Sequence, residues 1–317
     1  MKRLTFTIVL FLLIGFTYSC DEKKVEEKTV IENDLKELGY NGNIKSIIST
    51  KYKLYSKFGE DLTGGMIGKS INEFNNDGNL LEEWKYDLDG SLEWKNKYTY
   101  DEKGNLLEVC DYDSDGSLEW KCIGTYDGKG NLLVECKYDS DGSLEWKNKY
   151  TYEEKGKLEV CEYDSDGDLE RKEKYTYDKK GNLLEECEYD LNGSLKWKCI
   201  GTYDRKGNLL ENCKYDSDGS LKWKEKYTYD KKGNLLEVCG YDSYNSLELY
   251  EWKNKYTYDE KGNLLEKCYY DSYGNLERKW KYTYDENSNM IEEREYEYTN
   301  GVIEKPRTRT IYEITYR

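Results

Sequence analysis

The feature that most constrains this chain is a sequence repeat of about 26 residues. Glycines inside the repeat alternate in steps of 14 and 12 residues, as at Gly90, Gly104, Gly116 and Gly130. A fixed period of this length indicates that each unit is one supersecondary element, which buries its apolar side only against its neighbours. The repeat is marked by Tyr-Asp pairs that begin at Tyr86, Tyr112, Tyr138, Tyr163, Tyr189, Tyr215, Tyr241 and Tyr270.

Each repeat predicts a β-hairpin. Its Asp-x-x-Gly motif is typical of a turn, because Asp caps the turn through its side chain and Gly takes the positive-φ position, often as a bulge. The segments between turns alternate in side-chain character and are rich in Tyr, Trp, Thr and Leu, as strands are. In Ser91–Tyr100, one face carries Leu92, Trp94, Asn96, Tyr98 and Tyr100, and the other carries Glu93, Lys95, Lys97 and Thr99.

These hairpins predict an all-β fold. Counting turns from Gly78 to Gly301 gives about 18, hence roughly 20 antiparallel strands. We therefore predict a long antiparallel β-meander of tandem 26-residue hairpin repeats, which forms one continuous twisted or curled sheet. An aromatic face of this size is rarely left open, so the sheet must curl on itself, wind into a spiral or pair with another copy. The Glu and Lys of the other face predict exposed, weak cross-strand ion pairs.

The repeat carries a resemblance to a known family. The segment Tyr98-Thr-Tyr-Asp-Glu-Lys-Gly-Asn-Leu-Leu107 resembles the YD repeat of the RHS (rearrangement hot-spot) family, and the likeness covers most of residues 72–301. In large RHS toxins and teneurins such hairpins form a sheet that winds into a hollow shell, so the resemblance implies an RHS-like sheet here. The chain is also similar to small YD-repeat lipoproteins of Bacteroidota-like bacteria. Copies of the segment begin at Tyr150, Tyr175, Tyr227, Tyr256 and Tyr282.

The N-terminus predicts export. A basic start, Met1-Lys2-Arg3, precedes an apolar run from Leu4 to Gly15 that is short for a membrane span. With Ser19 before Cys20, the segment resembles a bacterial lipoprotein signal, which implies that residues 1–19 are removed and that Cys20 carries the lipid. The acidic stretch after Cys20 resembles the sorting signals of surface-exposed lipoproteins and implies anchoring to the outer membrane, with an outward-facing and a periplasmic orientation both left open. The alternative is an ordinary secretory signal with a free Cys20.

The remaining chain divides into three expected parts. Residues 20–40 predict a charged tether with a short helix, and residues 41–75 predict an opening β-hairpin of the same sheet. Residues 76–317 form the predicted YD-repeat sheet domain.

Seven cysteines fall at one repeat position. Neighbours in this set lie two strands apart, about 9–10 Å, which is too far for a disulfide. We interpret them as small apolar side chains packed beside the Trp of the adjacent strand. They are Cys110, Cys136, Cys161, Cys187, Cys213, Cys239 and Cys268.

Two further cysteines, Cys122 and Cys199, occur in two copies of Cys-Ile-Gly-Thr-Tyr. Pairing Tyr126 with Leu132 across the turn places Cys122 opposite Cys136 if the register continues unchanged. The same rule places Cys199 opposite Cys213. We therefore predict two cross-strand disulfides, Cys122–Cys136 and Cys199–Cys213, which an exported location permits. A register slip of one residue would destroy both pairings.

Composition excludes several functions. The chain has no His and a net charge of −16, so the commonest general base is missing and a nucleic-acid partner is not expected. The turn Asp113-Ser-Asp115-Gly116 is superficially similar to a calcium loop but lacks the bidentate Glu, and its turn chemistry explains it. We expect no metal, no cofactor and no catalytic residues, because repetition spreads each residue type evenly whereas a catalytic site breaks symmetry. We expect that the protein is not an enzyme.

Binding functions of different kinds remain open. One is a non-catalytic scaffold for binding or adhesion at the bacterial surface, with a glycan or protein ligand. A second is a carbohydrate-binding module whose aromatic face stacks on sugar rings, although the same stripe also fits packing inside a curled sheet. A third, a partner or immunity protein of an RHS-type toxin system, is implied only by the resemblance. The candidate glycan-binding residues are Trp94, Trp120, Trp146, Trp197 and Trp223.

Overall fold

The fold is known from a computed structural model that describes residues 33–153, 156–242, 250–299 and 303–317. Within these ranges no helix is long and apolar enough to cross a membrane. One short helix, α1 (Asp34–Glu37), precedes 20 strands. The strands are β1 (Ile44–Lys57), β2 (Glu60–Phe74), β3 (Leu80–Tyr86), β4 (Leu92–Tyr100), β5 (Leu106–Asp113), β6 (Leu118–Tyr126), β7 (Leu132–Asp139), β8 (Leu144–Glu153), β9 (Lys157–Asp164), β10 (Leu169–Tyr177), β11 (Leu183–Tyr189), β12 (Leu195–Tyr203), β13 (Leu209–Asp216), β14 (Leu221–Tyr229), β15 (Leu235–Asp242), β16 (Trp252–Tyr258), β17 (Leu264–Asp271), β18 (Leu276–Tyr284), β19 (Met290–Thr299) and β20 (Ile303–Tyr316).

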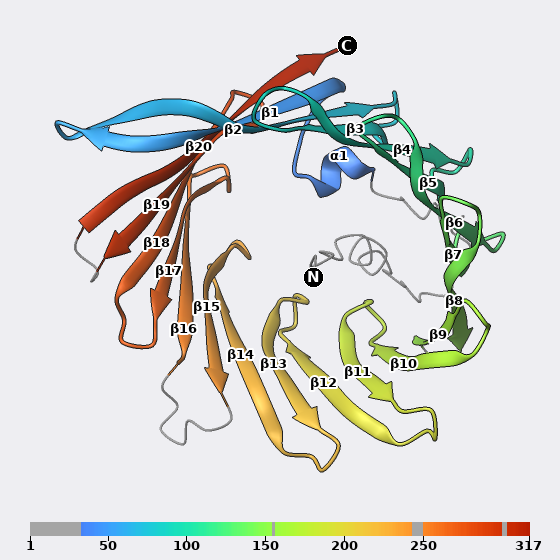
Figure 1. Cartoon of the computed structure of the whole chain (residues 1–317). Coiled ribbons are helices and arrows are strands. Elements are labelled where there is room, and N and C mark those ends of the chain that lie inside the picture. The colour runs from blue at the N-terminus through green and yellow to red at the C-terminus, as the bar shows by residue number, and fades with distance from the viewer. Residues whose placement is uncertain (1–32, 154–155, 243–249, 300–302) are drawn as a thin grey trace, which may run out of the picture.

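The strands form one closed barrel. Each strand pairs antiparallel with the next along the chain, and β1 also pairs antiparallel with β20, as in Ile47 with Ile314 (Figure 1). The all-β antiparallel meander is thus confirmed, but the predicted twisted or curled sheet is not open, because it closes into a barrel. Twist curves a sheet this long, and closure pairs the two strand edges that an open sheet exposes. With 20 strands at about 4.8 Å and a tilt of about 40°, the backbone radius is roughly 20 Å.

Each hairpin turn uses the predicted chemistry. In the turn after β4, the Asp101 carboxylate accepts hydrogen bonds from the backbone N–H of Lys103 and of Asn105 at 2.8 and 2.9 Å. Gly104 has φ of +88°, a conformation that glycine adopts without steric cost. The strand after the turn contains one extra residue, because Tyr100 pairs with Leu106 whereas Thr99 pairs with Glu108. Such bulges add local twist and curvature to the sheet.

The two faces of the sheet become the inside and outside of the barrel. The Tyr100 hydroxyl donates a hydrogen bond to Asp34 of α1 at 2.8 Å, and α1 lies within the ring of strands (Figure 1). Trp94 shares this inner face, as expected from its alternation with Tyr100. Lys97 and Thr99 lie on the outer face and are exposed. The predicted division into an aromatic face and a Lys/Glu/Thr face is therefore the division between lumen and outer surface.

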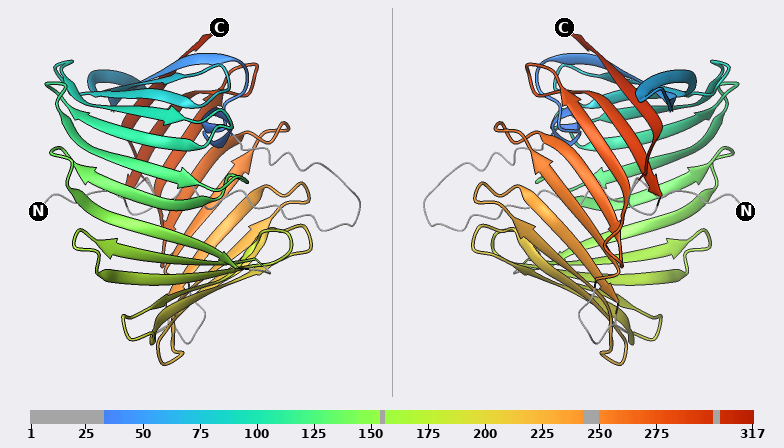
Figure 2. Two further views of the ribbon diagram at one scale, coloured as in Figure 1. Left: turned by 90° about the vertical axis from the view of Figure 1, so that its right-hand side faces the viewer. Right: turned by 90° about the vertical axis from the view of Figure 1, so that its left-hand side faces the viewer.

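The two ends of the barrel differ. We call the end formed by the turns that follow β4, β6, β10, β12, β14 and β16 the narrow rim; each of these turns has the sequence Asp-x-x-Gly-Asn. The opposite end, with turns such as Asp113–Ser117, is the wide rim. In Figure 1 the turns after β10, β12 and β14 lie closer to the centre of the ring than the turns after β11 and β13, and Figure 2 shows the barrel from its sides. Lysines link successive narrow-rim turns, as where Lys103 Nζ donates to the Gly128 carbonyl at 2.8 Å.

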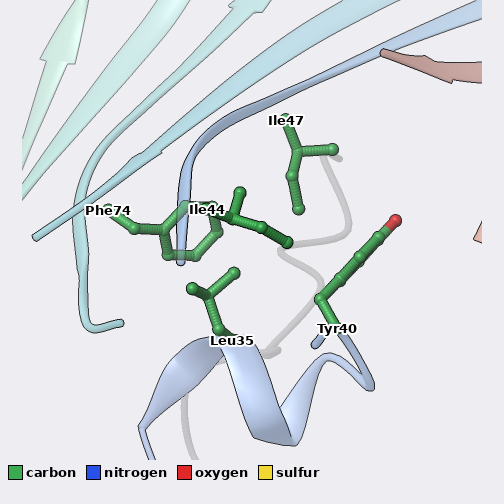
Figure 3. Packing of buried hydrophobic residues seen from close by; sticks show 5 residues of the cluster. All are labelled: Leu35, Tyr40, Ile44, Ile47 and Phe74. Atoms are coloured by element: carbon green, nitrogen blue, oxygen red, sulfur yellow. The ribbon is translucent and has the colours of Figure 1, made fainter. Parts of the chain in front are cut away.

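A hydrophobic cluster lies at the narrow rim. Leu35 and Tyr40 of the α1 segment pack against Ile44, Ile47 and Phe74, and all five side chains are buried (Figure 3). The predicted short helix of the tether therefore lies inside the barrel end, and the opening hairpin of residues 41–75 is β1 and β2.

Candidate binding lumen

The repeats agree on the outside of the barrel and differ on the inside. At the inner position that pairs with the Trp of the following strand, or with the residue that replaces this Trp, the side chain changes charge and size from repeat to repeat. The outer positions are nearly constant, so the variable inner positions are the candidate ligand contacts. The constant outer position is Lys95, Lys121, Lys147, Lys172, Lys198, Lys224, Lys253 and Lys279. The variable inner position is Lys85, Asp111, Lys137, Glu162, Glu188, Lys214, Gly240, Tyr269 and Glu295.

The outer face satisfies its own charges. Lys95 lies 2.9 Å from Glu82 across the strands, and Lys279 lies 3.2 Å from Glu266. The ammonium group of Lys97 also lies 5.7 Å from the ring centre of Tyr112. Such pairs are individually weak in water. The outer face is a solvated ladder of paired charges, as the sequence predicted.

The inner face has a constant layer near the narrow rim. The Tyr126 hydroxyl donates to the Leu106 carbonyl at 2.8 Å, and Tyr203 makes the same bond to Leu183. Leu132 in this layer is buried. These contacts recur from repeat to repeat and serve packing.

A belt of indoles lies on the inner face nearer the wide rim. We call Trp94, Trp120, Trp146, Trp197, Trp223 and Trp252 the tryptophan belt; Arg171 and Arg278 take the same position in two repeats. All six indoles are partly exposed. At a radius of roughly 20 Å, side chains of this size do not reach the barrel axis. The five predicted tryptophans therefore line a lumen and are neither a sealed core nor a flat outer platform.

Sequence reasoning missed Trp252. Its repeat contains the insertion near Leu249, which shifts the spacing, but the flanking Lys-Asn-Lys-Tyr-Thr-Tyr sequence identifies the position. Gly240 lies directly opposite Trp252, and a Cβ placed there would lie 2.3 Å from the indole ring. This glycine is what allows that indole to lie against the barrel wall. Trp84, in contrast, lies on the outer face at the position that cysteine takes in later repeats.

Charged groups flank the belt. Lys137 lies 5.2 Å from the ring centre of Trp120, and Lys214 lies 3.9 Å from that of Trp197. The indole N–H of Trp197 donates to Glu188 at 2.9 Å. On its other side each belt tryptophan pairs with the Asp that begins a wide-rim turn. These aspartates are Asp113, Asp139, Asp164, Asp216, Asp242 and Asp271.

Buried carboxylates and amides lie deeper in the lumen. Tyr150 donates to Glu135 at 3.1 Å, and burial raises the pKa of Glu135. Burial, with Glu119 nearby, raises the pKa of Asp111 to about 6. Among the described residues, the buried side-chain oxygens of Asn72, Asn96, Asn148 and Asn254 have no hydrogen-bond donor. The lumen wall thus presents aromatic faces beside carboxylate and amide acceptors, with lysine and arginine side chains among them.

The predicted disulfides are wrong. Tyr126 does pair with Leu132, but the bulge behind it shifts the register by one residue, so that Cys122 pairs with Lys137 and Ile123 with Cys136. Cys122 therefore faces the lumen and Cys136 faces outward. The same bulge separates Cys199, which pairs with Lys214, from Cys213, which pairs with Ile200. All the described cysteines are free thiols.

The predicted neighbours of the seven repeat cysteines are also wrong. Cys110 pairs with Lys97 and Lys121 on the outer face, opposite to the tryptophan belt. In the lumen, Cys122 lies 3.7 Å from Glu135, and burial and that carboxylate raise the pKa of its thiol. A thiol held protonated is a poor nucleophile. Residues 1–19 and Cys20 lie outside the described residues.

Comparison with known proteins gives only distant likenesses. No family model and no curated protein matches this chain. A porin-like protein from Bacteroides uniformis is similar in structure, with 11% identity, a TM-score of 0.39, and coverage of 86% of this chain and 98% of that one. The TcdB2-TccC3 structure matches 81% of this chain and 17% of its own, at 15% identity and a TM-score of 0.36. A porin-like protein from Bacteroides vulgatus matches at 11% identity, a TM-score of 0.25, and coverage of 87% and 99%. None of these assigns a family.

Proposed function

We propose that this chain is a non-catalytic binding protein of the bacterial cell envelope, held at the outer membrane by a lipid on Cys20, and that its ligand binds in the barrel lumen. The observation that carries this proposal is the tryptophan belt: six large aromatic side chains that remain partly exposed inside the barrel. Exposed indoles at a wall that varies between repeats are typical of a binding surface rather than of a packed core.

The outer surface supports the lumen as the site. A scaffold or adhesion role would use the sheet edges or the outer face. Closure of β1 on β20 pairs both edges, and the outer Lys and Glu side chains already contact each other. The partly exposed indoles of the tryptophan belt lie inside.

A carbohydrate is the ligand class that the belt favours. The apolar face of a sugar ring stacks on an indole, while its hydroxyls need hydrogen-bond acceptors beside that indole. Trp120 lies between the carboxylates of Asp111 and Asp139 in the register of the sheet. Buried amide oxygens such as that of Asn148 lie deeper along the same wall.

The test is a binding screen of residues 21–317 against glycans and peptidoglycan fragments. We expect binding that Trp146→Ala or Trp120→Ala weakens by about tenfold or more, which is about 1.4 kcal/mol. Trp84→Ala is the matched control, because Trp84 lies on the outer face. Thermal unfolding of each variant separates loss of contact from loss of fold. Retention of binding in both belt variants, or equal loss in Trp84→Ala, would contradict the proposal.

A further inference from the structure

The two rims carry different charge. The described wide-rim turns contain no lysine or arginine, and those of the repeats contain aspartates, for example Asp113–Ser117 and Asp139–Ser143. In the second of these, the Ser143 hydroxyl donates to Asp141 and lowers the pKa of that carboxyl, so it is ionised at neutral pH. The wide mouth of the barrel is therefore a ring of negative charge, which attracts cations and repels anions. The narrow-rim turns carry lysines in addition to their aspartates, namely Lys103, Lys129, Lys180, Lys206, Lys232 and Lys261.

In the lumen, too, carboxylates outnumber cations. From β3 to β18, eight carboxylates but six cations occupy inner positions, before the rim aspartates are added. The carboxylates are Glu83, Asp111, Glu135, Glu162, Glu173, Glu186, Glu188 and Glu225. The cations are Lys85, Lys137, Arg171, Lys214, Lys267 and Arg278.

Lysine side chains of the protein already place their ammonium groups over the indoles of the lumen. Beyond the contacts of Lys137 and Lys214, Lys85 lies 6.0 Å from the ring centre of Trp94, and Lys267 lies 5.1 Å from that of Trp280 on the inner face of β18. An ammonium group over an indole gains cation–π energy, more so when water is displaced, and a nearby carboxylate adds Coulomb attraction. The inner wall thus has a geometry that accepts ammonium groups.

We infer that the lumen selects a ligand with protonated amines, namely an oligosaccharide of amino sugars whose amino groups are free. This inference rests on the proposed function and names the class of glycan. The sugar rings stack on the belt, and the ammonium groups offset the surplus of carboxylates over cations, which a neutral glycan would not. An acidic glycan would meet repulsion at the wide rim before it reached the belt.

The decisive comparison uses three probes measured by calorimetry on residues 21–317: a glucosamine hexamer, the N-acetylglucosamine hexamer and spermine. We expect the glucosamine hexamer to bind at least about tenfold more tightly than its acetylated counterpart, with the advantage shrinking between about 20 and 200 mM salt. Equal affinity, or preference for the acetylated hexamer, would overturn the inference while leaving the proposed function standing. If spermine binds as tightly as the glucosamine hexamer, the lumen selects amines but not glycans. If none of the three probes binds, both the selection for amines and the selection for glycans of amino sugars are overturned.

A pair of variants on one strand locates the effect. Asp111 faces the lumen beside Trp120, whereas Glu108 faces outward on the same strand. We expect Asp111→Asn to weaken the glucosamine hexamer about three- to tenfold and to leave the acetylated hexamer unchanged. Glu108→Gln should change neither. Equal effects of the two variants would show that bulk charge, and not the lumen, is responsible.

Discussion

At the scale of the residue, the role of each side chain is set by the face on which its strand position lies. Trp84 and Trp94 are ten residues apart, yet Trp84 lies outside, where the Lys95 ammonium is 4.8 Å from its ring centre, and Trp94 lies inside in the belt. Because the side-chain period of a strand is two, the register alone separates these roles.

Asp111 gives a prediction at this scale. Its raised folded-state pKa of about 6, against about 3.9 in an unfolded chain, means that the folded protein binds this proton more tightly. Stability therefore falls as pH rises through that window, and the ionised carboxylate destabilises the fold above it. We expect Asp111→Asn to raise the melting temperature at pH 7.5 by about 2 °C, or about 1 kcal/mol after allowing for solvent screening, and to have no effect near pH 4. Calorimetric scans at the two pH values check this. A stabilisation of equal size at both would contradict the charge argument.

At the scale of the element, the hairpin was predictable and its register was not. Asp-x-x-Gly turns and alternation are local, so strand number, turn position and the two faces follow from the sequence. Five of the six belt tryptophans follow as well. The extra residue after each turn, such as Leu133 between Leu132 and Val134, shifts every later pair by one. Turn chemistry indicates that a bulge is present but not where the register changes, and this is why Cys122 and Cys136 were placed on one face.

Thiol counting tests the register. Because the bulge places Cys122 and Cys136 on opposite faces, and likewise Cys199 and Cys213, we expect nine free thiols besides Cys20. Alkylation of the unfolded, unreduced protein followed by intact-mass measurement gives the number directly. Each disulfide formed between two of these cysteines would lower the count by a pair, so a count of seven or five would contradict the register.

At the scale of the whole molecule, closure turns a repetitive sheet into a barrel with an inner and an outer wall. The sheet closes through β1 and β20, which lie at opposite ends of the described chain and are both longer than the repeat strands. Their pairing is non-local and lies outside the repeat pattern, so no local signal in the repeat predicts it. Without closure the belt would be an exposed stripe with no lumen. The two ends of the barrel then differ, because the α1 segment lies at the narrow rim and the wide rim is acidic.

Hydrogen–deuterium exchange of β1 and β20 tests closure most directly. In the closed barrel the backbones of both strands, as at Ser49 and Thr310, lie between two paired neighbours. The account therefore predicts that β1 and β20 are protected to the same degree as central strands such as β11 and β12. Fast exchange at alternate residues along either strand would show a free sheet edge and would contradict the closed lumen.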